Sequence, residues 1–223
     1  MNYWNDFTHY GGSTVMLSGA IVVTLWLIAG RAWKMALWWC VLFGSGLTLV
    51  LVTKLAFVGW GVGIRALDFT GISGHAMRAM AVMPVMLYLV LQKAPRRWRM
   101  AGVLVGIGFG IMIGISRLVV HAHSNSEMIS GCILGAIVSI GFIAIAERCA
   151  PPTVNRWLIA ISLMAVFSTS YAKSAPTQRW LTSMALYVAG HERPYIRSTW
   201  KMAPPRAASS SDPAVDELLL EEN

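Results

Sequence analysis

Charged residues are scarce in this chain. They make up 13% of its 223 residues, whereas 56% of the residues are hydrophobic. Soluble domains carry about 25% charged residues, so this chain has too little charge to cover a surface that faces water on all sides. The composition therefore argues against a soluble protein and favours one whose exterior lies in lipid.

Cysteine is also rare. The three cysteines, Cys40, Cys132 and Cys149, lie in or beside apolar runs, and no pair of them has the spacing of a metal site or indicates a disulfide framework. Residues 1–12 contain no Lys or Arg, and no small-residue cleavage site stands out after the first apolar run. We therefore expect that run to be retained as a helix rather than removed as a signal peptide.

Long apolar runs fill most of the first 171 residues. Six of them are candidate membrane-spanning helices, at residues 13–29, 35–52, 75–91, 101–115, 128–146 and 157–171. The fourth run is rich in glycine, which lets membrane helices approach closely, so we expect it to pack tightly on a neighbour. The predicted fold is an all-α integral membrane bundle of about six transmembrane helices.

The composition changes towards the C-terminus. We predict that residues 1–174 form the membrane bundle and that residues 175–203 contain an amphipathic segment at the membrane surface, with Trp180 and Tyr187 at headgroup level. Residues 204–223 are rich in Ala, Ser, Pro and acidic residues, a composition typical of a disordered tail.

The basic residues are distributed unevenly between the predicted loops. The loops after the first, third and fifth runs contain Arg31, Lys34, Lys93, Arg96, Arg97, Arg99, Arg148 and Arg156, whereas the even loops contain Lys54, Arg65 and Arg117. The positive-inside rule places the odd loops in the cytoplasm, so the net charge of +8 needs no nucleic acid to explain it. We expect an inner-membrane protein, in a bacterium, whose even loops face the periplasm.

Two clusters of polar residues follow the second and fourth runs. The first contains Phe69-Thr70-Gly71-Ile72-Ser73-Gly74-His75, with Lys54 and Arg65 before it and Arg78 after it, and the second contains Ser116, Arg117, His121, His123 and Glu127. Ionisable groups at membrane depth are costly and usually functional. Because two predicted helices separate the clusters, both emerge on the same outward face and can form one site.

These residue types suit phosphoryl transfer. Phosphate oxygens need cations and N–H donors, which are available from Arg117, Lys54, Ser73 and the amide of Gly74. A Ser-Gly pair just before a helix also presents backbone N–H groups to an anion. One histidine can attack phosphorus and a second can protonate the leaving oxygen. Glu127 follows His123 by four residues, so we expect both on one face of a helical turn, with the carboxylate orienting the imidazole.

The spacing of the second cluster resembles the third motif of the type 2 phosphatidic acid phosphatase superfamily, S-R-x5-H-x3-D. The tripeptide Ser73-Gly74-His75 resembles the second motif, P-S-G-H, and Lys54 resembles the lysine of the first motif, K-x6-R-P. The resemblance covers about residues 54–134. It implies a helical bundle, a phosphohistidine intermediate, and neither a metal nor another cofactor.

The same resemblance implies a role for each matching residue. His123 would be the nucleophile, Glu127 its orienting carboxylate and His75 the general acid. The residues that it assigns to phosphate binding are Lys54, Ser73, Gly74 and Arg117.

Three positions depart from the motifs of the family. Glu127 replaces the usual Asp and adds one methylene, and Ile72 replaces the proline of P-S-G-H. Gly61 stands where the first motif has its arginine, so Arg65 and Arg78 are candidate substitutes. A further candidate is His121, which has no motif position and suits contact with the site or with a lipid headgroup.

The sequence thus predicts a metal-independent phosphatase that hydrolyses a lipid phosphate or pyrophosphate. Two alternatives remain open: a phosphotransferase, in which a lipid hydroxyl replaces water in the second step, and a non-catalytic relative that binds lipid headgroups. Vanadate-dependent haloperoxidases belong to the same superfamily, but they are expected to be soluble. The predicted partners are the lipid substrate and membrane lipids, with no nucleic acid. The oligomeric state and the identity of the lipid stay open.

Overall fold

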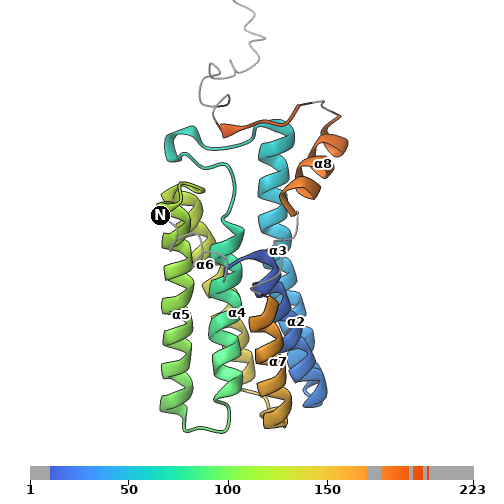
Figure 1. Cartoon of the computed structure of the whole chain (residues 1–223), viewed down its shortest axis with the longest axis vertical. Coiled ribbons are helices and arrows are strands. Elements are labelled where there is room, and N and C mark those ends of the chain that lie inside the picture. The colour runs from blue at the N-terminus through green and yellow to red at the C-terminus, as the bar shows by residue number, and fades with distance from the viewer. Residues whose placement is uncertain (1–10, 170–176, 191–192, 198–199, 201–223) are drawn as a thin grey trace, which may run out of the picture.

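The computed structural model describes residues 11–169, 177–190, 193–197 and 200. In these residues every regular element is a helix, apart from an isolated β-bridge between Ile64 and Phe69 (Figure 1). The prediction of an all-α fold is confirmed.

Helices overlap all six of the predicted spans. They are α2 (Ser13–Ala29), α3 (Trp33–Trp60), α4 (Gly74–Val90), α5 (Arg96–Val119), α6 (Asn125–Ala146) and α7 (Arg156–Ser168). The short 3-10 helix η1 (Arg65–Leu67) lies between α3 and α4, and α8 (Thr177–Ala189) follows α7. Among the described helices, α3, α5 and α6 are long and apolar enough to cross a membrane, whereas α2, α4 and α7 are apolar but shorter. The count of six spans therefore stays a prediction.

The predicted surface segment contains α8, which packs against α3. Trp180 and Tyr187 on this helix are both exposed, and their position at headgroup level stays a prediction. The predicted disordered tail at residues 204–223 lies outside the described residues.

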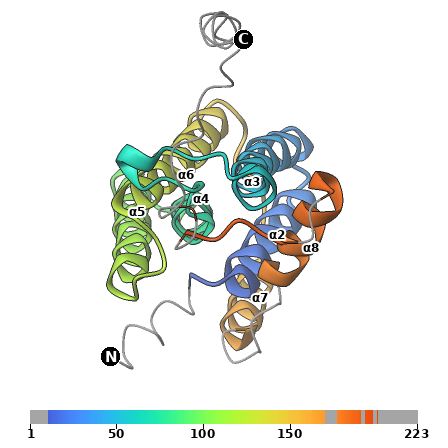
Figure 2. The same cartoon turned by 90° about the horizontal axis from the view of Figure 1, so that it is seen from above.

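Helix α4 lies at the centre of the bundle (Figure 2). It contacts α2, α3, α5 and α6, and most of its residues are buried. The polar side chains of its first turns, His75 and Arg78, are therefore enclosed by several helices rather than left on a surface.

Glycines bring α5 against α4. A Cβ at Gly106 would lie 2.5 Å from the backbone nitrogen of Pro84, and one at Gly110 would lie 2.9 Å from the Cα of Met80. Both distances are shorter than a van der Waals contact, so the two backbones approach this closely because glycine carries no side chain. The predicted tight packing of the glycine-rich helix is confirmed, and its neighbour is α4.

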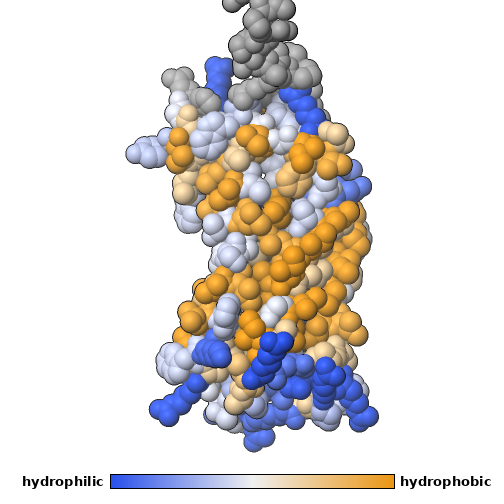
Figure 3. Space-filling model, turned by 180° about the vertical axis from the view of Figure 1, so that it is seen from behind, coloured by the Kyte–Doolittle hydropathy of each residue, from blue (hydrophilic) through white to orange (hydrophobic). Residues whose placement is uncertain are grey.

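Apolar side chains cover much of the exterior. Large exposed residues on the long helices include Leu37, Leu104, Val105 and Ile137. Figure 3 shows a broad hydrophobic band across one face, with hydrophilic side chains gathered at the lower end. A surface of this size and polarity suits contact with lipid chains.

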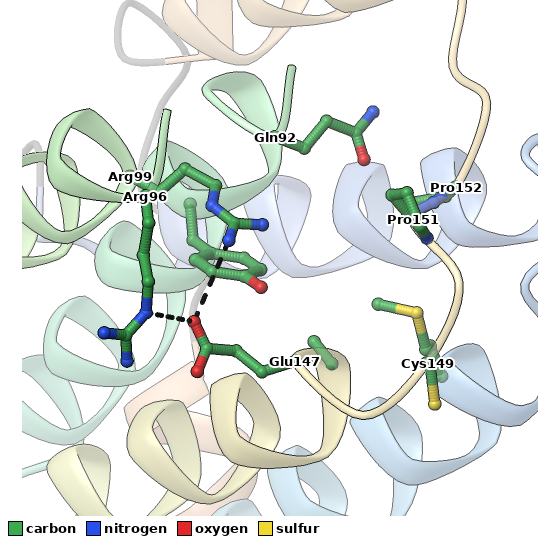
Figure 4. A pocket seen from close by; sticks show the side chains of 10 residues that line it. Gln92, Arg96, Arg99, Glu147, Cys149, Pro151 and Pro152 are labelled. Carbon is green, nitrogen blue, oxygen red and sulfur yellow. Dashed lines mark ion pairs between the residues drawn. The ribbon is translucent and has the colours of Figure 1, made fainter. Parts of the chain in front are cut away.

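The loops predicted to be cytoplasmic meet at one end of the bundle. A pocket of about 340 Å³ at that end is lined by residues from α3, α4, α5, α6 and the segment before α7. In it, Glu147 pairs with Arg96 at 3.5 Å and approaches Arg99 at 4.0 Å (Figure 4). At the opposite end, where α4 and α6 begin, the Ser73 amide donates to the carbonyl of Glu127 at 3.0 Å. The fold thus separates the basic loops from the two polar clusters.

Candidate active site

Histidine and glutamate of the second cluster form a hydrogen-bonded pair where α6 begins. Nδ1 of His123 lies 2.7 Å from Oε2 of Glu127, and the two side chains are 12% and 1% exposed. An ionised carboxylate accepts hydrogen bonds but cannot donate them, so Nδ1 carries the proton in this pair. Nε2 of His123 then keeps its lone pair and is the nitrogen available for nucleophilic attack.

The pair forms in a different way from the expected helical turn. Helix α6 begins at Asn125 after the N-cap Ser124, so His123 lies just outside the helix. Ser124 and Glu127 form a capping box: the Glu127 amide donates to the Ser124 hydroxyl at 3.4 Å, and the Ser124 amide donates to Glu127 Oε2 at 3.3 Å. The carboxylate that caps the helix therefore also holds the imidazole. The pattern S-x-x-E at residues 124–127 was the sequence signal for this cap.

Burial sets the protonation of His123. It lowers the pKa of this imidazole below its ordinary value of 6.5, and the hydrogen bond with Glu127 opposes the shift without cancelling it. The ring is therefore mostly neutral at pH 7, which is the nucleophilic form of histidine.

Three cations of the sequence clusters gather around His75. Lys54 from α3, Arg78 from α4 and Arg117 from the last turn of α5 all act electrostatically on the His75 imidazole, as does His123. The three cations also repel one another, so their grouping favours an anion with more than one negative charge as the occupant. Phosphate has that charge.

The start of α4 offers further donors to an anion. Ser73 is fully buried, and its hydroxyl has no hydrogen-bond partner among the residues that the structure describes. Gly74 is the first residue of α4, where backbone N–H groups have no partner within the helix. Buried polar groups are normally hydrogen-bonded. An anion bound at this helix start would supply the partner that the Ser73 hydroxyl lacks among the described residues.

The loop before α4 folds against α3 beside Lys54. Gly71 has a φ of 146°, which residues with a Cβ rarely adopt, and a Cβ there would lie 3.2 Å from Lys54 Cγ. The Ile72 amide donates to the Thr53 hydroxyl at 3.2 Å. These contacts join the Ser73-Gly74-His75 segment to Lys54, which precedes Ser73 by 19 residues.

The three additional candidates have different surroundings. Arg78 lies among the cations of the site and donates to the Ser13 hydroxyl at 3.0 Å. Arg65 is exposed in η1, and its guanidinium lies 5.4 Å from the ring centre of Trp200. His121 is exposed in the turn after α5. Of the two candidate substitutes for the missing first-motif arginine, Arg78 is the one placed beside Lys54.

Two residues to which the sequence analysis gave no role also bind Glu127. The Thr70 amide donates to Oε1 at 2.8 Å, and the Thr70 hydroxyl donates to the same oxygen. Arg197 lies in the segment after α8. Its Nη2 also donates a hydrogen bond to Oε1, and it donates to the Thr70 hydroxyl at 3.1 Å. Thr70 stands inside the first polar cluster, which was a signal for its position. Arg197 belongs to no motif.

The described residues contain no group of three His, Cys, Asp or Glu side chains arranged to hold a metal ion. The positive charges of the site come from its lysine and arginines. Their donors, together with the start of α4, fit a tetrahedral oxyanion such as phosphate.

Comparisons with known proteins agree with these motifs. The sequence model of the PAP2 superfamily matches residues 56–150. The chain is also 36% identical over 203 residues to an uncharacterized 22.5 kDa protein in the cps region of Klebsiella pneumoniae, a match that covers 87% of this chain and 96% of that relative. No solved structure matches the chain. The resemblance seen in the motifs is confirmed, and the chain belongs to the PAP2 superfamily.

Proposed function

We propose that this protein is a membrane phosphatase that hydrolyses a lipid phosphate or pyrophosphate. Superfamily membership supports phosphatase activity at this coarse level. The observation that carries the proposal is the hydrogen bond of 2.7 Å between His123 and Glu127, at the edge of the cations that surround His75. A nucleophile, the carboxylate that orients it and a binding site for phosphate are thereby close together.

The first step transfers the phosphoryl group to the protein. Nε2 of His123 attacks phosphorus, so that a P–N bond forms while the P–O bond to the lipid breaks. The negative charge of the bound phosphate offsets the surrounding cations and stabilises protonated His75, which then gives its proton to the leaving oxygen. Lys54, Arg78 and Arg117 stabilise the negative charge on the three remaining phosphoryl oxygens.

The second step releases phosphate. Water attacks the phosphohistidine and gives its proton to His75, and the P–N bond breaks with the electron pair returning to Nε2. Glu127 stays hydrogen-bonded to Nδ1 throughout, which keeps the ring aimed at phosphorus and stabilises the positive charge that develops on it.

The position of the site supports a lipid substrate. It lies at one end of a bundle whose exterior is broadly apolar, near the ends of the long helices α3 and α5 (Figures 1 and 3). A lipid with its chains along this exterior would bring its phosphate to the level of the site. Phosphatidic acid, phosphatidylglycerol phosphate, a polyprenyl pyrophosphate and a lipid A phosphate are the candidate substrates.

Phosphate release by the purified protein in detergent tests the proposal on a panel of these four lipids. We expect release from at least one lipid by the wild type and none by His123→Ala. Radioactive lipid phosphate should also label the wild type with a bond that acid cleaves and alkali does not. Transfer of the label to an added lipid alcohol would instead identify a phosphotransferase. Binding of the lipids with neither release nor transfer would overturn the proposal in favour of a non-catalytic relative.

A further inference from the structure

The segment after α8 returns to the candidate active site. The Tyr195 amide donates to the carbonyl of Val58 at 3.0 Å. The indole of Trp200 donates to the carbonyl of Gly61 at 2.9 Å, and its ring meets Phe57 edge to face at 5.4 Å. These contacts attach the segment to the end of α3 on both sides of residue 197. Both anchors therefore restrict where that residue can lie.

Between the two anchors, the guanidinium of Arg197 reaches the carboxylate that holds the nucleophile. Nη2 donates to Oε1 of Glu127 and to the Thr70 hydroxyl, and Nε lies 3.7 Å from Oδ1 of Asp68. Arg197 is 31% exposed at the rim, whereas Glu127 is 1% exposed. A buried carboxylate is stable when it is paired with a cation and hydrogen-bonded. The guanidinium of Arg197 supplies the positive charge that pairs with Glu127.

The two oxygens of Glu127 have separate partners. Oε1 binds Thr70 and Arg197, whereas Oε2 binds His123 and the Ser124 amide. This division matters because Glu127 stands where the superfamily motif has Asp. The extra methylene adds a rotatable bond, which would let the carboxylate turn away from the imidazole.

We propose that Arg197 is a positioning residue of this enzyme. Together with Thr70 it fixes Oε1 so that Oε2 stays on His123, and in this way it compensates for the longer side chain of Glu127. The inference rests on the proposed role of His123 as nucleophile. Arg197 acts through Glu127 and does not touch the phosphate.

Kinetics of Arg197→Ala test the inference, with Arg193→Ala as the matched control. Arg193 is an exposed arginine of the same segment. Loss of positioning should lower kcat by about tenfold or more and change KM by less than about twofold in Arg197→Ala, with both constants unchanged in Arg193→Ala. Thr70→Val removes another donor to Oε1 without altering the tail and should also lower kcat. A raised KM with normal kcat in Arg197→Ala would mean that Arg197 binds substrate, which would overturn the inference.

A double-mutant cycle with Glu127→Asp tests the compensation itself. The shorter carboxylate lacks the extra rotatable bond, so adding Arg197→Ala to Glu127→Asp should cost less than about threefold in kcat. An equal loss in the two backgrounds would refute compensation.

The tautomer of His123 provides a readout that needs no substrate. In protein labelled with ¹⁵N-histidine, the imidazole of the wild type should be protonated at Nδ1, and Arg197→Ala should give a mixture of tautomers. If the wild type released no phosphate but the tautomer still changed in Arg197→Ala, the proposed function would fail while the positioning role of Arg197 remained. If the wild type were active and neither kcat nor the tautomer changed in Arg197→Ala, the positioning role of Arg197 would be refuted and the proposed function would stand.

Discussion

His123 and Glu127 face each other across the first turn of α6, with Nδ1 of the imidazole 2.7 Å from Oε2 of the carboxylate. The histidine precedes the helix, and the glutamate reaches back to it as part of the helix cap. This geometry fixes the ring while leaving Nε2 available, as a nucleophilic histidine requires.

Replacing the proposed nucleophile should abolish turnover. His123→Ala removes the nitrogen that accepts the phosphoryl group, so we expect kcat to fall by roughly a thousandfold or more, equivalent to ~4 kcal/mol of barrier. His121→Ala is the matched control, because His121 is an exposed histidine of the same turn. Phosphate release from the preferred lipid measures both variants. Near-normal activity in His123→Ala would contradict the assignment.

The acid limb of the pH profile should lie below pH 6.5. Burial lowers the pKa of His123 below that value, so the neutral, nucleophilic ring persists as the pH falls and is lost at a lower pH than for an exposed histidine. A ¹⁵N NMR titration of the His123 imidazole measures this pKa directly. Glu127→Gln should lower it further, because it removes the carboxylate that stabilises the protonated ring. A pKa above 6.5 in the wild type would show that Glu127 outweighs burial.

Activity should survive removal of divalent metal ions. Lys54, Arg78 and Arg117 place positive charge where a metal would otherwise neutralise the phosphoryl oxygens. Phosphate release after treatment with EDTA should therefore match that of the untreated protein to within about twofold. Activity that returned strictly on addition of magnesium would count against this mechanism.

Two glycines of α5 should respond differently to the same substitution. A Cβ at Gly106 would lie 2.5 Å from the backbone nitrogen of Pro84, whereas a Cβ at Gly108 would meet nothing within 4 Å. Gly106→Ala should therefore destabilise the bundle by about 1–3 kcal/mol through overpacking. Gly108→Ala should leave stability unchanged or slightly raised, because alanine favours the helix. Thermal unfolding in detergent compares them, and equal midpoints would show that α4 and α5 are not closely packed.

The active site should face the periplasm. The basic loops lie at the end opposite the site, and the positive-inside rule places them in the cytoplasm. In a variant lacking Cys40, Cys132 and Cys149, a cysteine introduced by Ala122→Cys should react with an impermeant maleimide in whole cells. A cysteine introduced by Pro95→Cys should react only after the cells are lysed.

Both test positions are exposed, and neither belongs to the capping box of α6. The reverse labelling pattern would place the site in the cytoplasm. It would then favour phosphatidic acid of the cytosolic leaflet over lipid carriers recycled after export.

Local patterns in the sequence determined the helices, the segregation of charge and the spacing of the central pair. Each apolar run forms a helix because its own backbone groups must be satisfied where water is absent. Consecutive runs alternate in direction, so the loops with most Lys and Arg gather at one end. A separation of four residues put His123 within reach of Glu127 by way of the helix cap.

The tertiary structure decided which cations join the site. Arg65 and Arg78 were both candidates in the sequence, with Arg78 one helical turn after His75. Arg78 lies on the central helix α4 among the cations of the site, while the guanidinium of Arg65 lies over the ring of Trp200. Arg197 meets Glu127 across 70 residues of chain. That contact depends on how α8 packs against α3 and where the following segment is anchored. No local periodicity encodes such a path, because it results from the packing of elements that are distant in the sequence.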